Sequence, residues 1–260
     1  MISQQERQHA ADALFEAGRN CRPITQVSKT WPQMEIEDSY AVQQLWAEKR
    51  VAAGARVIGH KIGLTSRAMQ QASKMTEPDY GVLLDDMAYV DGARIPANRF
   101  AAPRLEVELA FVLGKRLGGK HVTLYDVLDA TAYVTPAMEI IDYRTEVPRA
   151  IVDTIADNAA AAGIVTGGRA VRPMDVDLRW CAATLSKNGV IEESGVSAAI
   201  MGHPGMGIVW LANRLARHDI HLEAGHILLA GSFTRPVNVA AGDVIHADFG
   251  PLGAIAVSFS

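Results

Sequence analysis

Hydrophobic residues recur at helical spacing in the first 54 positions of the chain and at strand spacing over most of the remainder. The first helical run consists of Ala10, Ala13, Leu14 and Ala17. Residues 36–54 repeat the same three- or four-residue spacing and close on a glycine, which is a common helix end. We therefore expect a helical N-terminal portion at residues 1–54.

Beyond residue 54, short apolar runs separated by glycine, proline and asparagine predict mainly strands. Strands are expected at 56–64, 104–113 and 132–142 and after a turn that begins at 77, and helices at 65–73, 123–130, 151–163 and 204–218. Asn188-Gly189 predicts a tight hairpin turn, because both residue types tolerate positive φ. The pattern as a whole predicts an α+β protein in which residues 55–260 form a rolled sheet or a sandwich.

Composition and charge exclude several classes of protein. The chain has 260 residues, 49% hydrophobic and 21% charged, which is typical of a globular protein with a large core. Its formal net charge of −4 argues against nucleic acid or an anionic membrane surface as a partner, since both require a concentrated basic face. A small-molecule partner is expected instead.

Cysteine content and the N-terminal segment bear on location. Cys21 and Cys181 are too few for a disulfide framework, which fits a reducing compartment. The first twenty residues contain no apolar signal region, and no stretch reaches the length of uninterrupted apolar residues that a spanning helix needs. We expect a soluble, cytoplasmic protein without a membrane partner.

The segment "PRLEVELAFVLG" places two carboxylates inside an apolar strand. Glu106 and Glu108 share one face of that strand, because side chains alternate between faces. The same face continues with Ala110 and Val112, and the other face is wholly apolar, so both faces are expected to be buried. Two like charges in such a place are unfavourable unless a cation compensates them.

Glu139, in "YVTPAMEIID", is a third acidic residue in an apolar strand. Three carboxylates without cysteine or histidine suit a hard divalent cation, with Mg²⁺ favoured and Mn²⁺ possible. From spacing alone, a solvated strand edge or a barrel lumen is an equally open interpretation.

Lys61 and Asp79 are the candidates for proton transfer. Lys61 lies among Ile58, Ile62 and Leu64, and burial there is expected to lower its pKa. A lysine that extends to solvent from a strand end and an ordinary turn aspartate are the structural alternatives. His60 is adjacent, but alternation along the strand directs it to the opposite face.

Five separated motifs carry a family resemblance. In order, they are "GHKIGLTSRAMQQASKMTEPDYGVLLDDM", "PRLEVELAFVLG", "PAMEIID", "DTIADNAA" and "LAGSFTRPV". From about residue 35 to its end, the chain resembles the hydratase/decarboxylase branch of the fumarylacetoacetate hydrolase superfamily. Within that branch it resembles the 2-oxohept-4-ene-1,7-dioate hydratases of aromatic meta-cleavage pathways.

The resemblance implies a mixed β-roll at residues 55–260, preceded by the small helical portion. It also implies an Mg²⁺ site, with the metal ligands on Glu106, Glu108 and Glu139. The proton-transfer residues of the family match Lys61 and Asp79. These are the five residues that the chemistry of the strands also selects.

The expected reaction is Mg²⁺-dependent addition of water to a 2-oxo-alkenoate, 2-oxohept-4-ene-1,7-dioate, which gives a 4-hydroxy-2-oxo acid. Decarboxylation of 4-oxalocrotonate and hydration of 2-hydroxypenta-2,4-dienoate belong to the same branch and remain open. Acylpyruvate hydrolysis is disfavoured, because that group uses a histidine to activate water and His60 faces away. A non-catalytic partner of a pathway enzyme would be expected to lack a ligand or Lys61.

The far end of the substrate is less well defined by sequence. Between "EIIDYR" and "IVDTIADN" the chain has only "TEVPRA", where the hydratases it resembles have a longer loop. A distal carboxylate requires a cation; Arg67 is the first candidate, and Arg144 or Arg149 the second. A solvated surface arginine is the alternative for each. Ser232 and Thr234 are further candidate substrate contacts.

Assembly is expected from the resemblance alone. Members of this branch form homo-oligomers, and a complex with a pathway decarboxylase or aldolase is possible. Light scattering would distinguish an oligomer from a monomer of this chain.

Overall fold

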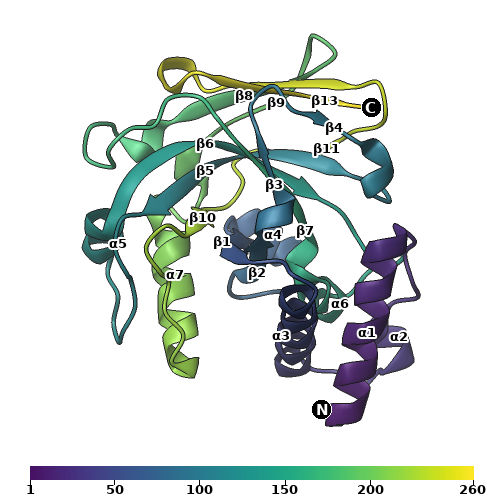
Figure 1. The fold of residues 1–260 in the computed structure, drawn as a ribbon. Coiled ribbons are helices and arrows are strands. Elements are labelled where there is room, and N and C mark those ends of the chain that lie inside the picture. Colours follow the sequence, from purple (N-terminus) through teal and green to yellow (C-terminus); the bar gives the residue numbers. More distant parts are fainter.

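The computed structural model describes residues 1–260, apart from the side chain of residue 72, and places three N-terminal helices beneath two curved sheets (Figure 1). The helices are α1 (Gln4–Asn20), α2 (Val27–Thr30) and α3 (Ile36–Ala52). The expected helical N-terminal portion is therefore present. A domain boundary at residue 54 stays a prediction.

Helix α1 begins with a capping box. The Ser3 hydroxyl accepts a hydrogen bond from the Glu6 amide, and the Glu6 carboxylate accepts one from the Ser3 amide. The buried face of α1 packs on α3 and on residues that follow it in the chain. This apolar cluster includes Ala10, Leu14, Val42, Trp46, Leu84, Met87 and Ala156. The N-terminal helices thus share a core with the sheet portion.

The larger sheet has eight strands in the order β2-β1-β10-β5-β6-β7-β3, with β11 paired to β5. Its strands are β1 (Val57–Gly63), β2 (Asp79–Leu84), β3 (Ala88–Val90), β5 (Arg104–Leu113), β6 (Thr131–Ile141), β7 (Ala161–Thr166), β10 (Ile227–Leu229) and β11 (Val237–Asn238). Pairs β1–β10 and β3–β7 are parallel, and the others are antiparallel. The sheet is therefore mixed, as expected for a β-roll.

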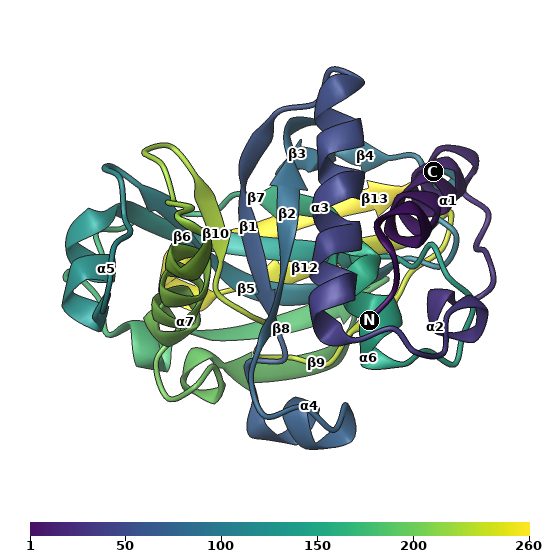
Figure 2. The ribbon, with the colours of Figure 1, turned by 90° about the horizontal axis from the view of Figure 1, so that it is seen from below.

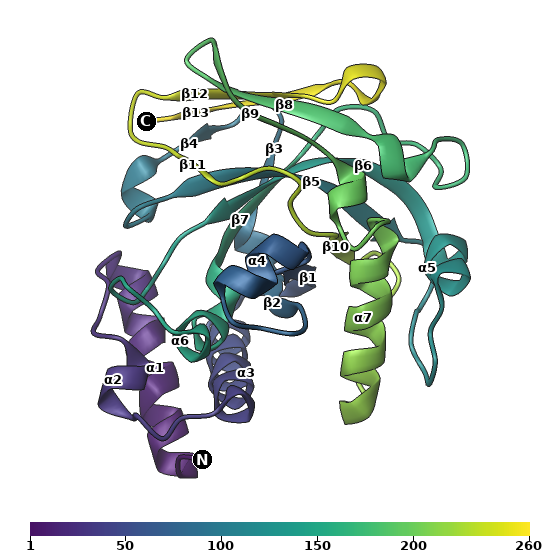
Figure 3. The same ribbon diagram turned by 180° about the vertical axis from the view of Figure 1, so that it is seen from behind.

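A second, five-stranded sheet covers one face of the first (Figure 3). Its strand order is β4-β13-β12-β8-β9, with β4 (Arg94–Ile95), β8 (Ala182–Lys187), β9 (Val190–Val196), β12 (Val244–Asp248) and β13 (Ala254–Phe259). Asn188 and Gly189, both at positive φ, form the turn between β8 and β9, which confirms the predicted hairpin.

The main core lies between the sheets. Alternate residues of β5 (Leu105, Val107, Leu109, Phe111 and Leu113) enter it, together with Leu185, Ile245 and Ile255 of the second sheet. Helices α5 (Leu124–Ala130) and α7 (Gly205–Leu215) lie side by side at one end of the molecule, away from α1 at the other end, and α3 lies between them (Figure 2). Helix α4 (Arg67–Ala72) lies between β1 and β2 in the chain.

The helix expected at 151–163 is shorter than the pattern indicated. Helix α6 spans only Ile151–Ala156, and β7 begins at Ala161. Asn158, Ala159 and Ala160 have positive φ, so the helix cannot continue through them. Asn158 fixes this reversal, because its side chain exchanges two hydrogen bonds with the Val82 backbone of β2. An alanine-rich composition therefore gave the wrong boundary.

Membrane insertion receives no support from the helices. In the part of the chain that the structure describes, none is both long and apolar enough to cross a bilayer.

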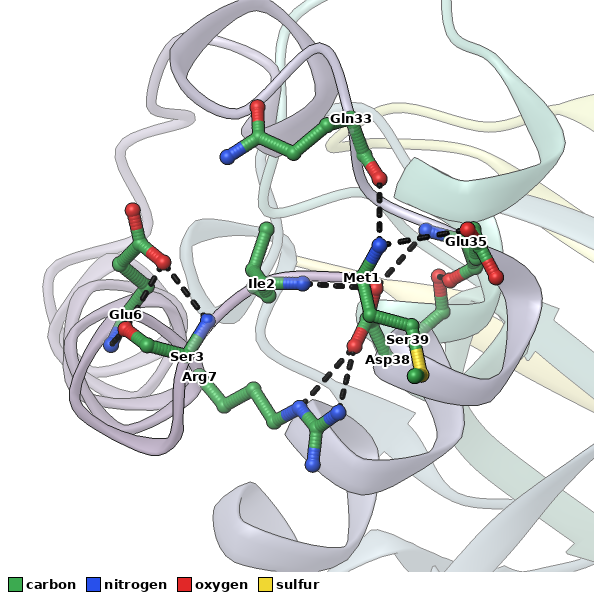
Figure 4. Close-up of polar contacts among 9 residues, drawn as sticks. All are labelled: Met1, Ile2, Ser3, Glu6, Arg7, Gln33, Glu35, Asp38 and Ser39. Carbon is green, nitrogen blue, oxygen red and sulfur yellow. Dashed lines mark hydrogen bonds and ion pairs between the residues drawn. The ribbon is translucent and has the colours of Figure 1, made fainter.

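A buried aspartate links the chain start to α3 (Figure 4). The Asp38 carboxylate accepts hydrogen bonds from the amides of Ile2 and Glu35 and from the Arg7 guanidinium, at 2.7–3.1 Å. Burial alone would raise the pKa of Asp38, but these donors outweigh it and lower the pKa. Asp38 therefore stays charged and connects the first residues of α1 with α3.

Replacing Asp38 with alanine should lower the free energy of unfolding by about 2–4 kcal/mol, because two amides and a guanidinium lose their acceptor. Chemical denaturation measures the change, and hydrogen exchange should show faster exchange in α1. Glu16→Ala is the control, because its pair with Arg19 is exposed. The Asp38 contribution is present above the ordinary pKa of aspartate and is lost as pH falls through the lowered folded-state value. Equal stability of the two variants would contradict this role.

Candidate active site

The three candidate metal ligands come together on the β5–β6 ladder. Glu106 lies directly opposite Glu139, and Glu108 is two residues further along β5 on the same face. One carboxylate oxygen of each lies within 4.8 Å of the others. Glu108 and Glu139 are each only 1% exposed. The solvated-edge interpretation is therefore wrong for these two residues.

The glutamate face of the β5–β6 pair is partly covered by other residues. Ala110 and Ala137, which continue that face on β5 and β6, are fully buried in a small cluster with Leu83, Ile164 and Leu229. The expectation that both faces of β5 are buried holds for the core face and for Glu108 and Ala110, whereas Arg104, Glu106 and Val112 are only half-buried.

Burial and mutual repulsion act on the carboxyl groups. Burial is the largest cause that raises the pKa of Glu106 and of Glu108, and the charge of Glu139 adds to it. Lys61 opposes both shifts. A cluster of this kind accepts a cation readily, since the cation replaces protons that the carboxyl groups would otherwise retain.

The oxygens also have the free positions that a metal requires. Glu108 Oε2 accepts a hydrogen bond of 2.9 Å from the Gly231 amide. Glu108 Oε1 and Glu139 Oε1 are buried and have no hydrogen-bond partner among the residues described. Mg²⁺ binds oxygen at about 2.1 Å, so ligands on opposite sides are about 4.2 Å apart. The size and all-oxygen character of the cluster therefore fit Mg²⁺ or Mn²⁺.

Lys61 reaches this cluster from β1. Its Nζ lies 3.2 Å from Glu139 Oε1, an ion-pair distance without hydrogen-bond geometry, and the residue is 5% exposed. The expectation of a lowered pKa is wrong here. Burial does lower the pKa of Lys61, but Glu139, Asp79 and the other two glutamates outweigh it, so the net pKa is raised.

Asp79 begins β2, and its Cα pairs with Gly63 of β1. A Cβ on Gly63 would lie 2.2 Å from Asp79 Oδ1 and 3.2 Å from Lys61 Nζ, so both side chains lie against this glycine. Burial raises the pKa of Asp79 to about 6, against the opposing effect of Lys61. Its Oδ1 is buried without a hydrogen-bond partner in the described residues. Lys61 and Asp79 thus face one space beside the glutamates.

His60 lies on the other side of β1, as alternation predicted. Its ring is 6.3 Å from that of Tyr80 and 6.1 Å from that of His226. Burial, assisted by His226, lowers the pKa of His60 to about 3, so the ring is neutral. It is not a partner of Lys61.

The residues predicted to contact the substrate differ in their surroundings. Ser232 and Thr234 lie in the segment after β10, where their hydroxyls bond to the Val107 backbone at 3.3 and 3.2 Å. Both therefore position this segment on β5. Arg67 is exposed at the start of α4, and Arg144 is paired with Asp157 at 2.7 Å. A substrate role for any of them stays a prediction.

Sequence reasoning missed three residues at the site. Gly63 and Gly231 have no chemistry of their own, and only tertiary structure shows what they contact. Arg104 could have been found, because it precedes Glu106 by two positions and so shares its strand face. Its charge also lowers the pKa of Glu106, although burial has the larger, opposite effect.

The chain is similar to known proteins over most of its length. The family model described as fumarylacetoacetate (FAA) hydrolase C-terminal matches residues 49–259. A 2-oxo-hept-4-ene-1,7-dioate hydratase from Escherichia coli is 52% identical over 96% of both chains. A 2-hydroxyhexa-2,4-dienoate hydratase from Comamonas testosteroni is 39% identical over 95% of both.

A solved structure is also very similar. The 4-oxalocrotonate decarboxylase from Pseudomonas putida G7, complexed with magnesium and adipate, has a TM-score of 0.97 and 33% identity, over 100% of this chain and 99% of that one. The expected mixed α+β fold with N-terminal helices is therefore confirmed. On its motifs, its fold and its relatives, the chain belongs to the fumarylacetoacetate hydrolase family.

Proposed function

We propose that this protein is a Mg²⁺-dependent hydratase that converts 2-oxohept-4-ene-1,7-dioate into a 4-hydroxy-2-oxo acid in meta-cleavage catabolism. The observation that carries the proposal is the convergence of two buried glutamates, Glu108 and Glu139, and the half-buried Glu106 with Lys61 and Asp79 in one place. The 52% identity to a hydratase of this name supports the choice of substrate.

The glutamates would hold the metal ion. Glu106, Glu108 and Glu139 supply the oxygens, and the Gly231 amide holds one oxygen of Glu108 in place. When bound, Mg²⁺ supplies electrostatic stabilisation of the negative charge that develops on the 2-oxo group of the substrate. The magnesium in the decarboxylase structure supports this assignment.

Lys61 and Asp79 would move the protons. A proton leaves C3 and one is added at C5, which converts the 4-ene into the conjugated 3-ene. Water then adds its hydroxyl at C4, and C3 receives the proton. We assign these transfers to Lys61 Nζ and Asp79 Oδ1, and the assignment is supported by their position against Gly63 beside the glutamates.

Decarboxylation of 4-oxalocrotonate is the second candidate, and the close likeness to a decarboxylase structure favours including it. It requires the same stabilisation of an enolate but no addition of water. Activity assays with and without Mg²⁺ separate the reactions when they compare three substrates: 2-oxohept-4-ene-1,7-dioate, 2-hydroxypenta-2,4-dienoate and 4-oxalocrotonate. Release of CO₂ without hydration would replace our proposal.

Glu108→Gln should weaken Mn²⁺ or Mg²⁺ binding by at least about tenfold, since one charged ligand is lost. The variant should still fold, because glutamine has the same size and removes a buried like charge. Calorimetric titration of metal measures affinity, and a thermal melt without metal checks folding. Glu192→Gln, at an exposed position of β9, is the matched control. Wild-type metal affinity in Glu108→Gln, or full activity in strong chelator, would refute the site.

Lys61→Ala should lower kcat by about 10²- to 10⁴-fold without weakening metal binding, because only a proton-transfer group is removed. Asp79→Asn should behave similarly. Saturated 2-oxoheptanedioate in deuterium oxide provides a direct readout, since NMR detects exchange at C3 without turnover. Exchange at the wild-type rate in Lys61→Ala would show that Lys61 has another role.

Gly63→Ala should lower kcat by about a hundredfold, because the new methyl group displaces Asp79 and Lys61 from their shared position. Metal affinity should change much less, since the glutamates are on other strands. Gly114→Ala, where a Cβ meets only Ala132 at 3.1 Å, controls for the general effect of adding a methyl group to a strand end. Equal kcat in the two variants would mean that the Lys61 and Asp79 positions are not critical.

A further inference from the structure

Two arginines, one of them on the same strand as Glu106 and Glu108, have buried nitrogens that lack a partner among the described residues. Arg104 Nε, Arg149 Nε and Arg149 Nη1 make no hydrogen bond to any described residue. Buried guanidinium N–H groups are almost always satisfied, because leaving them unpaired is unfavourable. These nitrogens are therefore available to an acceptor from outside the described residues, and an anion would also match their charge.

The two arginines converge on one aromatic ring. Both guanidinium groups lie over the ring of Tyr143, that of Arg104 at 5.4 Å from its centre. Arg104 begins β5, Tyr143 lies just after the end of β6, and Arg149 precedes α6. Three separate segments thus bring two positive charges to one place, which we call the Tyr143 arginine pair.

Other partly buried arginines already have carboxylate partners. Arg7 pairs with Asp38 at 2.7 Å, and Arg144 pairs with Asp157 at the same distance. Arg144 is therefore occupied by a structural contact. Arg149, five residues further along, has the same residue type and comparable burial but retains unpaired nitrogens.

The position of Arg104 on β5 connects the Tyr143 arginine pair with the candidate metal site. Arg104 and Glu106 share a face of β5 and are two residues apart, about 6.5–7 Å along the strand. With carbon–carbon bonds of about 1.5 Å, an extended chain advances about 1.25 Å per bond, so the end carbons of a seven-carbon diacid are about 7.5 Å apart. A diacid held at the glutamates by one end can therefore reach Arg104 with the other.

We propose that Arg149, together with Arg104 and supported by Tyr143, binds the distal carboxylate of a 2-oxo dicarboxylate and selects it over the monocarboxylate. The inference rests on the proposed function, because it takes the first carboxylate and the 2-oxo group to lie at the glutamates. The planar fork of arginine fits a carboxylate with two parallel hydrogen bonds. The missing acceptor for the buried nitrogens is then supplied by the substrate.

The test compares two saturated, unreactive probes, 2-oxoheptanedioate and 2-oxoheptanoate, which differ only at the far end. With Mg²⁺ present, calorimetry should show that the wild-type protein binds the diacid about tenfold to a hundredfold more tightly. Arg149→Ala should lose about tenfold or more of this preference. Arg149→Lys should retain part of it, because lysine supplies charge without the fork.

Two controls make the result specific. Arg217→Ala removes an exposed arginine and should keep the wild-type preference. Arg67→Ala tests the other candidate for the same carboxylate; if it loses the preference while Arg149→Ala keeps it, the inference is overturned. Thermal melts of each variant show whether a loss of binding reflects unfolding, and Arg149→Lys then replaces Arg149→Ala as the deciding variant.

The binding and hydration experiments distinguish a failure of this inference from a failure of the proposed function. Equal wild-type affinity for the two probes would overturn the distal subsite, even if both alkenoate substrates were hydrated. Conversely, a strong preference for the diacid probe in a protein that hydrates neither alkenoate would overturn the hydratase proposal and support the subsite.

Discussion

The pairing of Glu106 with Glu139 across the β5–β6 ladder is the constraint on which the site depends. It places two carboxylates on one rung of a covered sheet, with Glu108 beside them and a lysine 3.2 Å from one of their oxygens. Charges are unfavourable in such a place unless they are compensated. The cluster therefore does not stabilise the fold by itself, and its burial fits the cation site and the anionic substrate that we propose.

The surrounding sheet keeps these charges in place through backbone contacts. Gly231 donates its amide to Glu108, and Thr234 accepts a hydrogen bond from the Val107 amide. On the other side, Gln43 of α3 donates to the carbonyls of Tyr80 and Ile155, which ties the N-terminal helices to β2 next to Asp79. Elements from the start and the end of the chain thus position neighbouring parts of one site.

Local sequence predicted some features of the fold and of the candidate site, but not those that depend on contacts between distant segments. The extent of β5 and the shared face of Glu106 and Glu108 followed from the sequence pattern, because side-chain direction in a strand is a local property. The raised pKa of Lys61 did not follow, since it depends on glutamates from two other strands. The early end of α6 did not follow either, because Asn158 adopts positive φ where it bonds to β2, far away in sequence. Arg149 was, with Arg144, only the second candidate behind Arg67, because sequence does not show that Arg144 has a carboxylate partner and that Arg149 keeps unpaired nitrogens.

The contact between Gly231 and Glu108 joins residues 123 positions apart in the chain. A nascent chain that has not yet reached residue 231 therefore already contains all three glutamates and Lys61, but not the amide that orients Glu108. Strand β5 also pairs with β10, which is made later and lies between β5 and β1 in the sheet. On the ribosome, Glu108 thus receives its backbone donor only after residue 231 has been made, so a product that ends earlier would carry the four side chains without the contact that orients Glu108.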